Sequence, residues 1–142
     1  MAVILDTSAL VQLERLAKAG TMADLPLAEA PIIPVVVWAE ALVGVRLADT
    51  PERAARRRGH LEVIRRHASL QPFTPEIAEE YAEIFSELRK GGTMIPQNDL
   101  AVAATARFLA AAVLVGPLDE QHFRRVPGLA VQVIRGGFRI DH

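Results

Sequence analysis

The chain opens with an apolar run, residues 1–5, and no polar side chain interrupts it before Asp6. A run of this kind is typical of a strand that is buried on both faces, as in a parallel sheet covered by helices. Asp6 then stands at the carboxyl end of the strand, which is the edge where open α/β sheets place their ligands. Taken alone, Asp6 with Thr7 and Ser8 could equally begin a helix, because all three side chains are good helix caps.

Strand and helix patterns alternate along the rest of the chain. Helices are expected over residues 9–19 and 23–29, after Pro34 to about Ala48, from Thr50-Pro51 onward, from Thr74-Pro75 to Gly91-Gly92, and from Asn98, as the cap, to Ala110. Further strands are expected over residues 31–34, 70–73, 112–115 and 129–134. This alternation predicts one domain over residues 1–142 with an α/β fold. We expect a three-layer α/β/α sandwich around a mostly parallel sheet of about four or five strands.

The composition excludes several kinds of site. The chain has no cysteine, which rules out disulfides, thiol nucleophiles and zinc sites built on cysteine. No apolar run approaches the roughly 18 residues that a membrane-spanning helix needs. No basic stretch precedes the apolar start, as it would in a signal peptide. We therefore expect a cytoplasmic protein that has no membrane partner.

One segment is locally basic, although the net charge of −1 gives no general argument for nucleic-acid binding. Between Pro51 and His67 lie Arg53, Arg56, Arg57, Arg58, Arg65 and Arg66, against only Glu52 and Glu62. A stretch of this kind is ordinarily a solvated helix face. A basic face also suits a phosphate chain, so the sequence leaves both interpretations open.

Glu40 is a carboxylate in an otherwise apolar helical segment. Its neighbours at three and four residues are Val36, Val37, Val43 and Gly44. We therefore expect Glu40 to point with the buried face, where an unpaired carboxylate is costly and needs a cation or hydrogen-bond donors. The plainer alternative is a glutamate that reaches past the edge of a groove or pairs with a basic side chain.

Asp99 and Asp119 are the other two acids in apolar settings. Asp99 heads an apolar helix, where the helix dipole favours an acid in the first turn. Asp119 follows the turn that starts at Gly116, where an aspartate is equally ordinary. Asp119 nevertheless comes after the strand over 112–115, so it also belongs near the carboxyl edge of the sheet.

A group of carboxylates near one edge suits a hard divalent cation. Oxygen ligands without imidazole or thiolate are the set that Mg²⁺ or Mn²⁺ prefers. Without a cation the clustered carboxylates repel one another, and some of them have to be protonated. A bound metal ion relieves that repulsion and activates water for attack on phosphorus. The sequence shows no serine–histidine–acid triad that would offer another chemistry.

The acids and their neighbours resemble the motifs of PIN-domain nucleases. The matching segments are Asp6-Thr7-Ser8, Val37-Trp38-Ala39-Glu40, Asn98-Asp99-Leu100 with Ala103-Ala104-Thr105-Ala106, and Asp119 before His122-Phe123-Arg124-Arg125-Val126-Pro127-Gly128-Leu129. They occur in order over essentially the whole chain, which is most similar to the VapC toxins of bacterial and archaeal toxin–antitoxin operons. No single motif is specific, but the four together are.

This resemblance implies a PIN-like fold and a Mg²⁺- or Mn²⁺-dependent endoribonuclease, the toxin of a type II toxin–antitoxin module. It implies that the catalytic, metal-binding acids are Asp6, Glu40, Asp99 and Asp119, and that the hydroxyls of Thr7 and Ser8 orient the site. It also implies an RNA substrate, a cognate VapB-like antitoxin and a homodimer. Two positions depart from the usual pattern. Pro117 stands where a threonine or serine is common, and His122 stands where an aspartate is frequent.

Other classes of protein fit the sequence less well. A haloacid-dehalogenase-like phosphatase or a phosphoacceptor receiver domain also has an aspartate after its first strand. Both need a second acid close by and a lysine in the middle of the fold, whereas this chain has Ser8 there and only Lys18 and Lys90. The more serious alternative is a PIN fold without activity that serves as an interaction scaffold, although the presence of all four acids argues against it.

Overall fold

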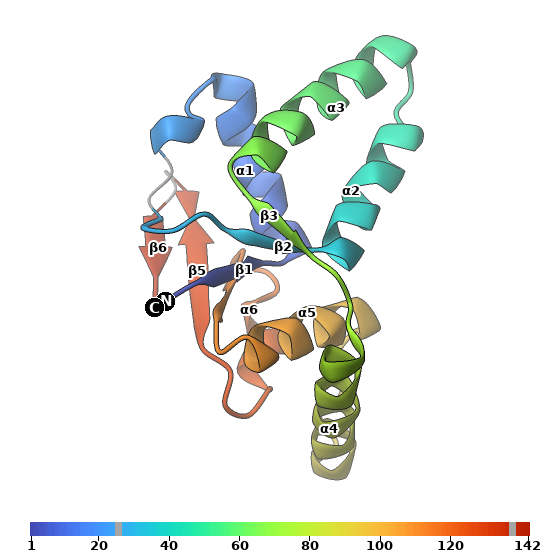
Figure 1. The fold of residues 1–142 in the computed structure, drawn as a ribbon, viewed down its shortest axis with the longest axis vertical. Helices are drawn as coiled ribbons and strands as arrows, with labels where there is room; N and C mark the ends of the chain where they lie inside the picture. Colours follow the sequence, from blue (N-terminus) through green and yellow to red (C-terminus); the bar gives the residue numbers. More distant parts are fainter. Residues whose placement is uncertain (25–26, 137–138) are drawn as a thin grey trace.

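The computed structural model describes residues 1–24, 27–136 and 139–142, and within them a six-stranded sheet runs through the centre of the molecule (Figure 1). The strands are β1 (Val3–Leu5), β2 (Ile32–Pro34), β3 (Ser69–Gln71), β4 (Ala112–Val115), β5 (Val131–Arg135) and β6 (Arg139–Asp141). Their order across the sheet is β3-β2-β1-β4-β5-β6. All neighbouring strands pair in parallel except β5 and β6, which are antiparallel.

Helices cover both faces of the sheet. They are α1 (Thr7–Ala19), α2 (Val35–Arg46), α3 (Pro51–Arg66), α4 (Pro75–Gly91), α5 (Gln97–Phe108) and α6 (Glu120–Arg124), with a 3₁₀ turn over Met22–Asp24. α1 and α3 lie on one side, and α5 with α4 lies on the other (Figure 1). The predicted α/β/α sandwich with a mostly parallel sheet is therefore confirmed. Among the described residues, no helix is both long and apolar enough to cross a membrane.

Local sequence signals explain where most of the helices begin and end. The hydroxyls of Thr50 and Thr74 accept hydrogen bonds from the backbone N–H groups three residues on, and a proline follows each. Proline loses nothing at the first helical position, because its missing N–H would have no partner there. Gly20 and Gly92 end α1 and α4 in the left-handed conformation, with φ of 74° and 66°. Glycine adopts that conformation without the steric cost of a Cβ.

Two expectations about the elements were wrong. β6 was missed and makes the sheet larger than the four or five strands expected, because three residues with alternating charge give no apolar signal. Helix α5 begins at Gln97 after Pro96, so Asn98 lies within its first turn and does not cap it. The helical turn expected over 23–29 falls partly outside the described residues. Of its described residues, 23 and 24 belong to the 3₁₀ turn and 27–29 to no helix.

The chain reverses its direction of winding between β1 and β4. From β1 it crosses through α1 to β2 on one side, whereas β4 and β5 lie on the other side of β1. The carboxyl ends of β1, β2 and β4 share one edge because these strands are parallel. In open α/β sheets, ligands bind outside the carboxyl ends of strands at such a reversal point.

Arg107 joins α5 to α4 and provides a test of the packing on that face. Its side chain is 15% exposed, and it forms ion pairs with Glu80 and Glu87 of α4 while donating a hydrogen bond to the Pro127 carbonyl. We expect Arg107→Met to lower the free energy of unfolding by about 2 kcal/mol, because two half-buried carboxylates lose their partner. Urea unfolding measures this change.

The matched control for Arg107→Met is Arg53→Met. Arg53 forms an ion pair with Asp49 at 2.8 Å, but both side chains are largely exposed. An exposed pair of this kind contributes at most about 1 kcal/mol. Equal losses from the two substitutions would show that the Arg107 cluster does not hold α4 on α5.

Candidate active site

Asp6 lies at the carboxyl end of β1 and is also the N-cap of α1. Its carboxylate accepts a hydrogen bond from the Ala9 backbone N–H at 2.9 Å. The Ser8 hydroxyl lies 2.8 and 2.9 Å from the two carboxylate oxygens. Asp6 is only 2% exposed, so both of its sequence interpretations hold. It caps a helix, and it is a buried carboxylate at the carboxyl edge of the sheet.

The environment of Asp6 opposes its negative charge. Burial raises the pKa of Asp6 from 3.8 to about 7, although the hydrogen bonds from Ala9 and Ser8 act in the opposite direction. The charges of Asp119 and Asp99 raise this pKa further. Three acids that lie 93 and 20 positions apart along the chain therefore act on one another through space. An arrangement of this kind is stabilised by a cation.

Asp99 lies in the first turn of α5 and contacts His122 of α6. The Nδ1 atom of His122 lies 2.8 Å from Asp99 Oδ2 and 4.0 Å from Asp119 Oδ1. Burial raises the pKa of Asp99, the contact with His122 lowers it, and the charge of Asp119 raises it. Asp119, the most exposed of these side chains, follows Leu118 in the turn after β4.

Glu40 does not occupy the buried face that its neighbours predicted. α2 buries Val37 and Ala41, whereas Val43 is 56% exposed and Glu40 lies at the margin of the packed face. Glu40 Oε1 accepts a hydrogen bond from Asn98 Nδ2 at 3.0 Å. Asn98 thus links Glu40 to the helix that carries Asp99.

Ser8 connects the acid of β1 to the turn after β4. Besides donating to Asp6, its hydroxyl accepts a hydrogen bond from the Gly116 backbone N–H at 2.8 Å. Thr7, the other expected hydroxyl residue, begins α1 and is half-buried. Sequence reasoning did not single out Gly116 or Asn98 for these contacts. The glycine followed by proline predicts a turn, and the asparagine beside Asp99 predicts a helix cap.

The donor set fits a hard divalent cation by chemistry and by charge. The acids supply carboxylate oxygens, and the mutual repulsion of Asp6, Asp99 and Asp119 would be relieved by a positive ion. Within residues 1–24, 27–136 and 139–142, no three acidic or imidazole side chains already stand as a metal-binding group. A cation that draws on all the acids would therefore require side-chain adjustment.

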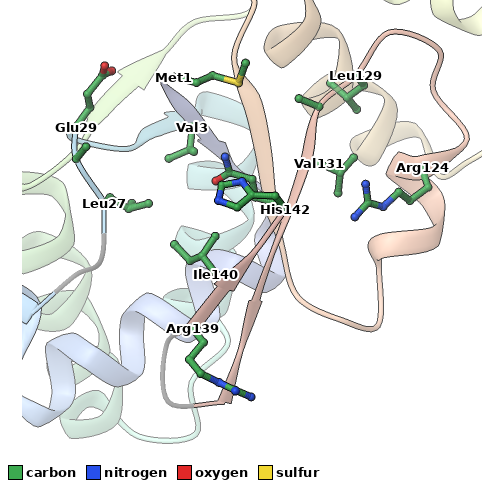
Figure 2. A pocket seen from close by; sticks show the side chains of 13 residues that line it. Met1, Val3, Leu27, Glu29, Arg124, Leu129, Val131, Arg139, Ile140 and His142 are labelled. Atoms are coloured by element: carbon green, nitrogen blue, oxygen red, sulfur yellow. The ribbon is translucent and has the colours of Figure 1, made fainter.

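A separate hollow of about 930 Å³ has none of the four acids among its lining residues, and Figure 2 shows it from close by. Met1, Val3, Val131, Arg139 and Ile140 are among the residues that line it. Met1 precedes β1, and β6 runs antiparallel to its neighbour, so this hollow belongs to the amino edge of the sheet. The acids occupy the opposite edge, and their chemistry, not the size of a cavity, marks them as the candidate site.

Comparison with known proteins identifies the family to which the chain belongs. A family model described as PIN domain matches residues 3–129, and the chain belongs to the PIN-domain family. Two relatives are named Ribonuclease VapC (Rickettsia bellii) and Ribonuclease VapC1 (Rickettsia felis). They are 32% and 30% identical over 134 residues, which cover 94% of this chain and 97% of each relative. The resemblance to VapC proteins is thus confirmed.

Among solved structures, the chain is similar to part of VapBC-5, a member of the VapBC family of toxin–antitoxin systems from Mycobacterium tuberculosis. The identity is 29% and the TM-score is 0.66, with 95% of this chain and 99% of that chain covered. The shared fold therefore extends over essentially the full length of both chains.

Proposed function

We propose that this protein is a metal-dependent endoribonuclease, the toxin of a VapBC-type toxin–antitoxin module. The observation that carries the proposal is the buried Asp6, which lies at the reversal point of the sheet and is repelled by Asp99 and Asp119. A buried acid held among other acids destabilises a protein, and a cation-dependent reaction is a reason to retain it. The name Ribonuclease VapC of the two relatives supports RNA as the substrate.

In this proposal, Asp6, Glu40, Asp99 and Asp119 hold Mg²⁺ or Mn²⁺. The metal ion supplies a Lewis acid and an activated water for attack on a phosphodiester. Ser8 holds the Asp6 carboxylate in place, and the Ala9 backbone N–H fixes one of its oxygens. Asn98 of α5 positions Glu40 by donating a hydrogen bond to its carboxylate. The cytoplasm, which holds cellular RNA, is the compartment in which such an enzyme would act.

The experiment that tests the proposal is incubation of the purified protein with total RNA and Mg²⁺, followed by sequencing of the new RNA ends. We expect discrete cleavage sites that are absent when Asp6→Asn is used instead. A PIN fold that serves only as an interaction scaffold would give no such ends, so intact RNA in the presence of Mg²⁺ would favour that alternative.

Gly116 gives a prediction about the support of Asp6. The Cβ of an alanine at this position would lie 3.1 Å from both Cβ and Oγ of Ser8. Because Ser8 orients Asp6, we expect Gly116→Ala to reduce the rate of RNA cleavage about tenfold through misplacement of the carboxylate. The matched control is Gly59→Ala in α3, where an added Cβ meets nothing within 4 Å. Equal rates for the two variants would contradict this role of Ser8.

The partners are also part of the proposal. The solved relatives include VapBC complexes from toxin–antitoxin systems, which supports a VapB-like antitoxin as the protein that holds this chain inactive. A homodimer is proposed as well. An apolar groove of about 550 Å³ lies between α2, α4 and α5, and we call it the α2–α4 groove. The residues that line it include Val35, Ala39, Phe73, Tyr81 and Ala101.

Phe73 provides the test of the homodimer. It is 51% exposed and packs edge-on against Tyr81 with ring centroids 6.0 Å apart. If a second copy covers the α2–α4 groove, light scattering will show a dimer for the wild type and a monomer for Phe73→Asp. Val11→Asp places the same charge on an exposed apolar position of α1 and should remain dimeric. A wild-type monomer at high protein concentration would contradict the homodimer.

A further inference from the structure

His122 is the one basic side chain that the structure brings against the acids of the candidate site, among the described contacts. It lies on α6, a helix of five residues, and its side chain is 24% exposed. The Nδ1 atom of its ring is within 4.0 Å of an oxygen of Asp99 and of an oxygen of Asp119. One nitrogen atom is therefore hydrogen-bonded to the carboxylate of Asp99 and lies 4.0 Å from that of Asp119.

The contact with Asp99 is a hydrogen bond to a charged acceptor. At 2.8 Å it has the length expected for an imidazole N–H that donates to a carboxylate. Either the neutral ring with its proton on Nδ1 or the imidazolium can make this bond, so it requires no particular protonation state. The same Nδ1 atom that contacts Asp99 Oδ2 lies 4.0 Å from Asp119 Oδ1.

A divalent cation that took Asp99 Oδ2 as a ligand would need this oxygen at much shorter range than the His122 nitrogen does. Mg²⁺ binds carboxylate oxygens at about 2.1 Å and tolerates little departure from octahedral geometry. An imidazole N–H that points at Asp99 Oδ2 both fills the space beside that oxygen and presents a positive dipole toward the ion. The His122 N–H would therefore compete with a cation for Asp99 Oδ2.

We propose that His122 controls cation binding at this site. Its ring donates a hydrogen bond to Asp99 when no cation is bound and releases Asp99 when a cation binds. This inference rests on the proposed metal-dependent function and adds a residue that governs how strongly the site takes its metal. His122 is a positioning residue in this role, since it acts on Asp99 and not on the substrate.

The test is direct titration of purified protein with Mn²⁺, in which free Mn²⁺ is followed by electron paramagnetic resonance. We expect His122→Ala to bind Mn²⁺ about tenfold more tightly than the wild type, because binding no longer breaks a charge-assisted hydrogen bond. His122→Asn keeps an N–H donor close to the Nδ1 position and should remain near the wild-type affinity. His67→Ala removes an exposed imidazole at the end of α3 and should have no effect.

Two results would overturn this role of His122. Unchanged affinity in His122→Ala would mean that the contact does not compete with the cation, and weaker affinity would mean that His122 supports cation binding, as a ligand or by holding Asp99 in place. The Asp6→Asn variant reports separately on the proposed function. If wild type binds Mn²⁺ and Asp6→Asn does not, the metal site stands whatever His122 does. If neither wild type nor His122→Ala binds Mn²⁺, both proposals fail.

A second measurement uses the wild type alone and so does not depend on the folding of a variant. Nitrogen-15 spectra of the histidine rings are recorded during titration with Mg²⁺. We expect the Nδ1 signal of His122 to shift as its bond to Asp99 breaks, while that of His67 stays unchanged. A His122 signal that stays fixed at saturating Mg²⁺ would contradict release.

Discussion

Asp6→Asn is expected to reduce the rate of RNA cleavage by roughly a thousandfold, since a charged metal ligand contributes several kcal/mol to the reaction. The substitution keeps the shape of the side chain. Asp6 Oδ1 accepts hydrogen bonds from Ala9 and Ser8, and the amide oxygen of asparagine can accept both. Only the second contact of the Ser8 hydroxyl, with Oδ2 at 2.9 Å, is replaced by a contact with the amide nitrogen. The loss of activity would therefore report the loss of charge and not the loss of fold.

Circular dichroism and a thermal melt of Asp6→Asn provide the control for intact structure. Expression in cells offers an independent reading, because growth arrest caused by the wild type should disappear with the same substitution. If Asp6→Asn cleaves RNA as fast as the wild type at matched metal concentration, Asp6 is not a ligand and the assignment of the site is wrong.

The same substitution should stabilise the protein at neutral pH when divalent cations are removed. The pKa of Asp6 is raised from 3.8 to about 7 in the folded protein, mainly by burial. The folded state thus binds the proton more tightly than the unfolded state. The contribution of protonated Asp6 to the free energy of unfolding is fully present below pH 3.8. It falls as the pH rises and is lost above about pH 7. That shift corresponds to about 4 kcal/mol at most.

Asparagine does not ionise, so Asp6→Asn escapes this loss. We expect its advantage in the free energy of unfolding over the wild type to grow between pH 5 and pH 7 and to level off above that range, in urea titrations with EDTA present. Asp99 also has a raised pKa, but both proteins contain it, and its contribution largely cancels in the comparison. A difference between the two proteins that does not change with pH would show that Asp6 is not forced to ionise in a buried place.

The sequence predicted the parts of the fold that local rules control. The apolar run before Asp6 is β1, with Ile4 and Leu5 fully buried, and the threonine–proline pairs at Thr50 and Thr74 begin α3 and α4. These signals depend on neighbours in the chain, so a single sequence contains them. β6 escaped because its pairing with β5 depends on a distant partner and not on its own three residues.

The residues of the candidate site are a prediction from the sequence, whereas their contacts come only from the structure. Glu40 was assigned to the buried side because α2 is apolar nearly throughout, so its neighbours could not identify the packed face. The packing of α2 against the sheet and α3 determines which face of the helix is buried, and it leaves Val43 exposed. The contact between Glu40 and Asn98 joins residues 58 positions apart, and the contact between Asp99 and His122 joins two helices. Such pairings arise from tertiary structure and have no local signal.

The central claim is that these acids act by holding a divalent cation, and removal and return of the metal ion tests it most directly. The purified wild type is treated with excess EDTA, incubated with a single-stranded RNA, and then supplied with Mg²⁺ or Mn²⁺ above the chelator concentration. The account predicts no cleavage in EDTA and restored cleavage with the metal ion, at a rate that Asp6→Asn does not reach. Cleavage that continues in EDTA at the original rate would contradict it.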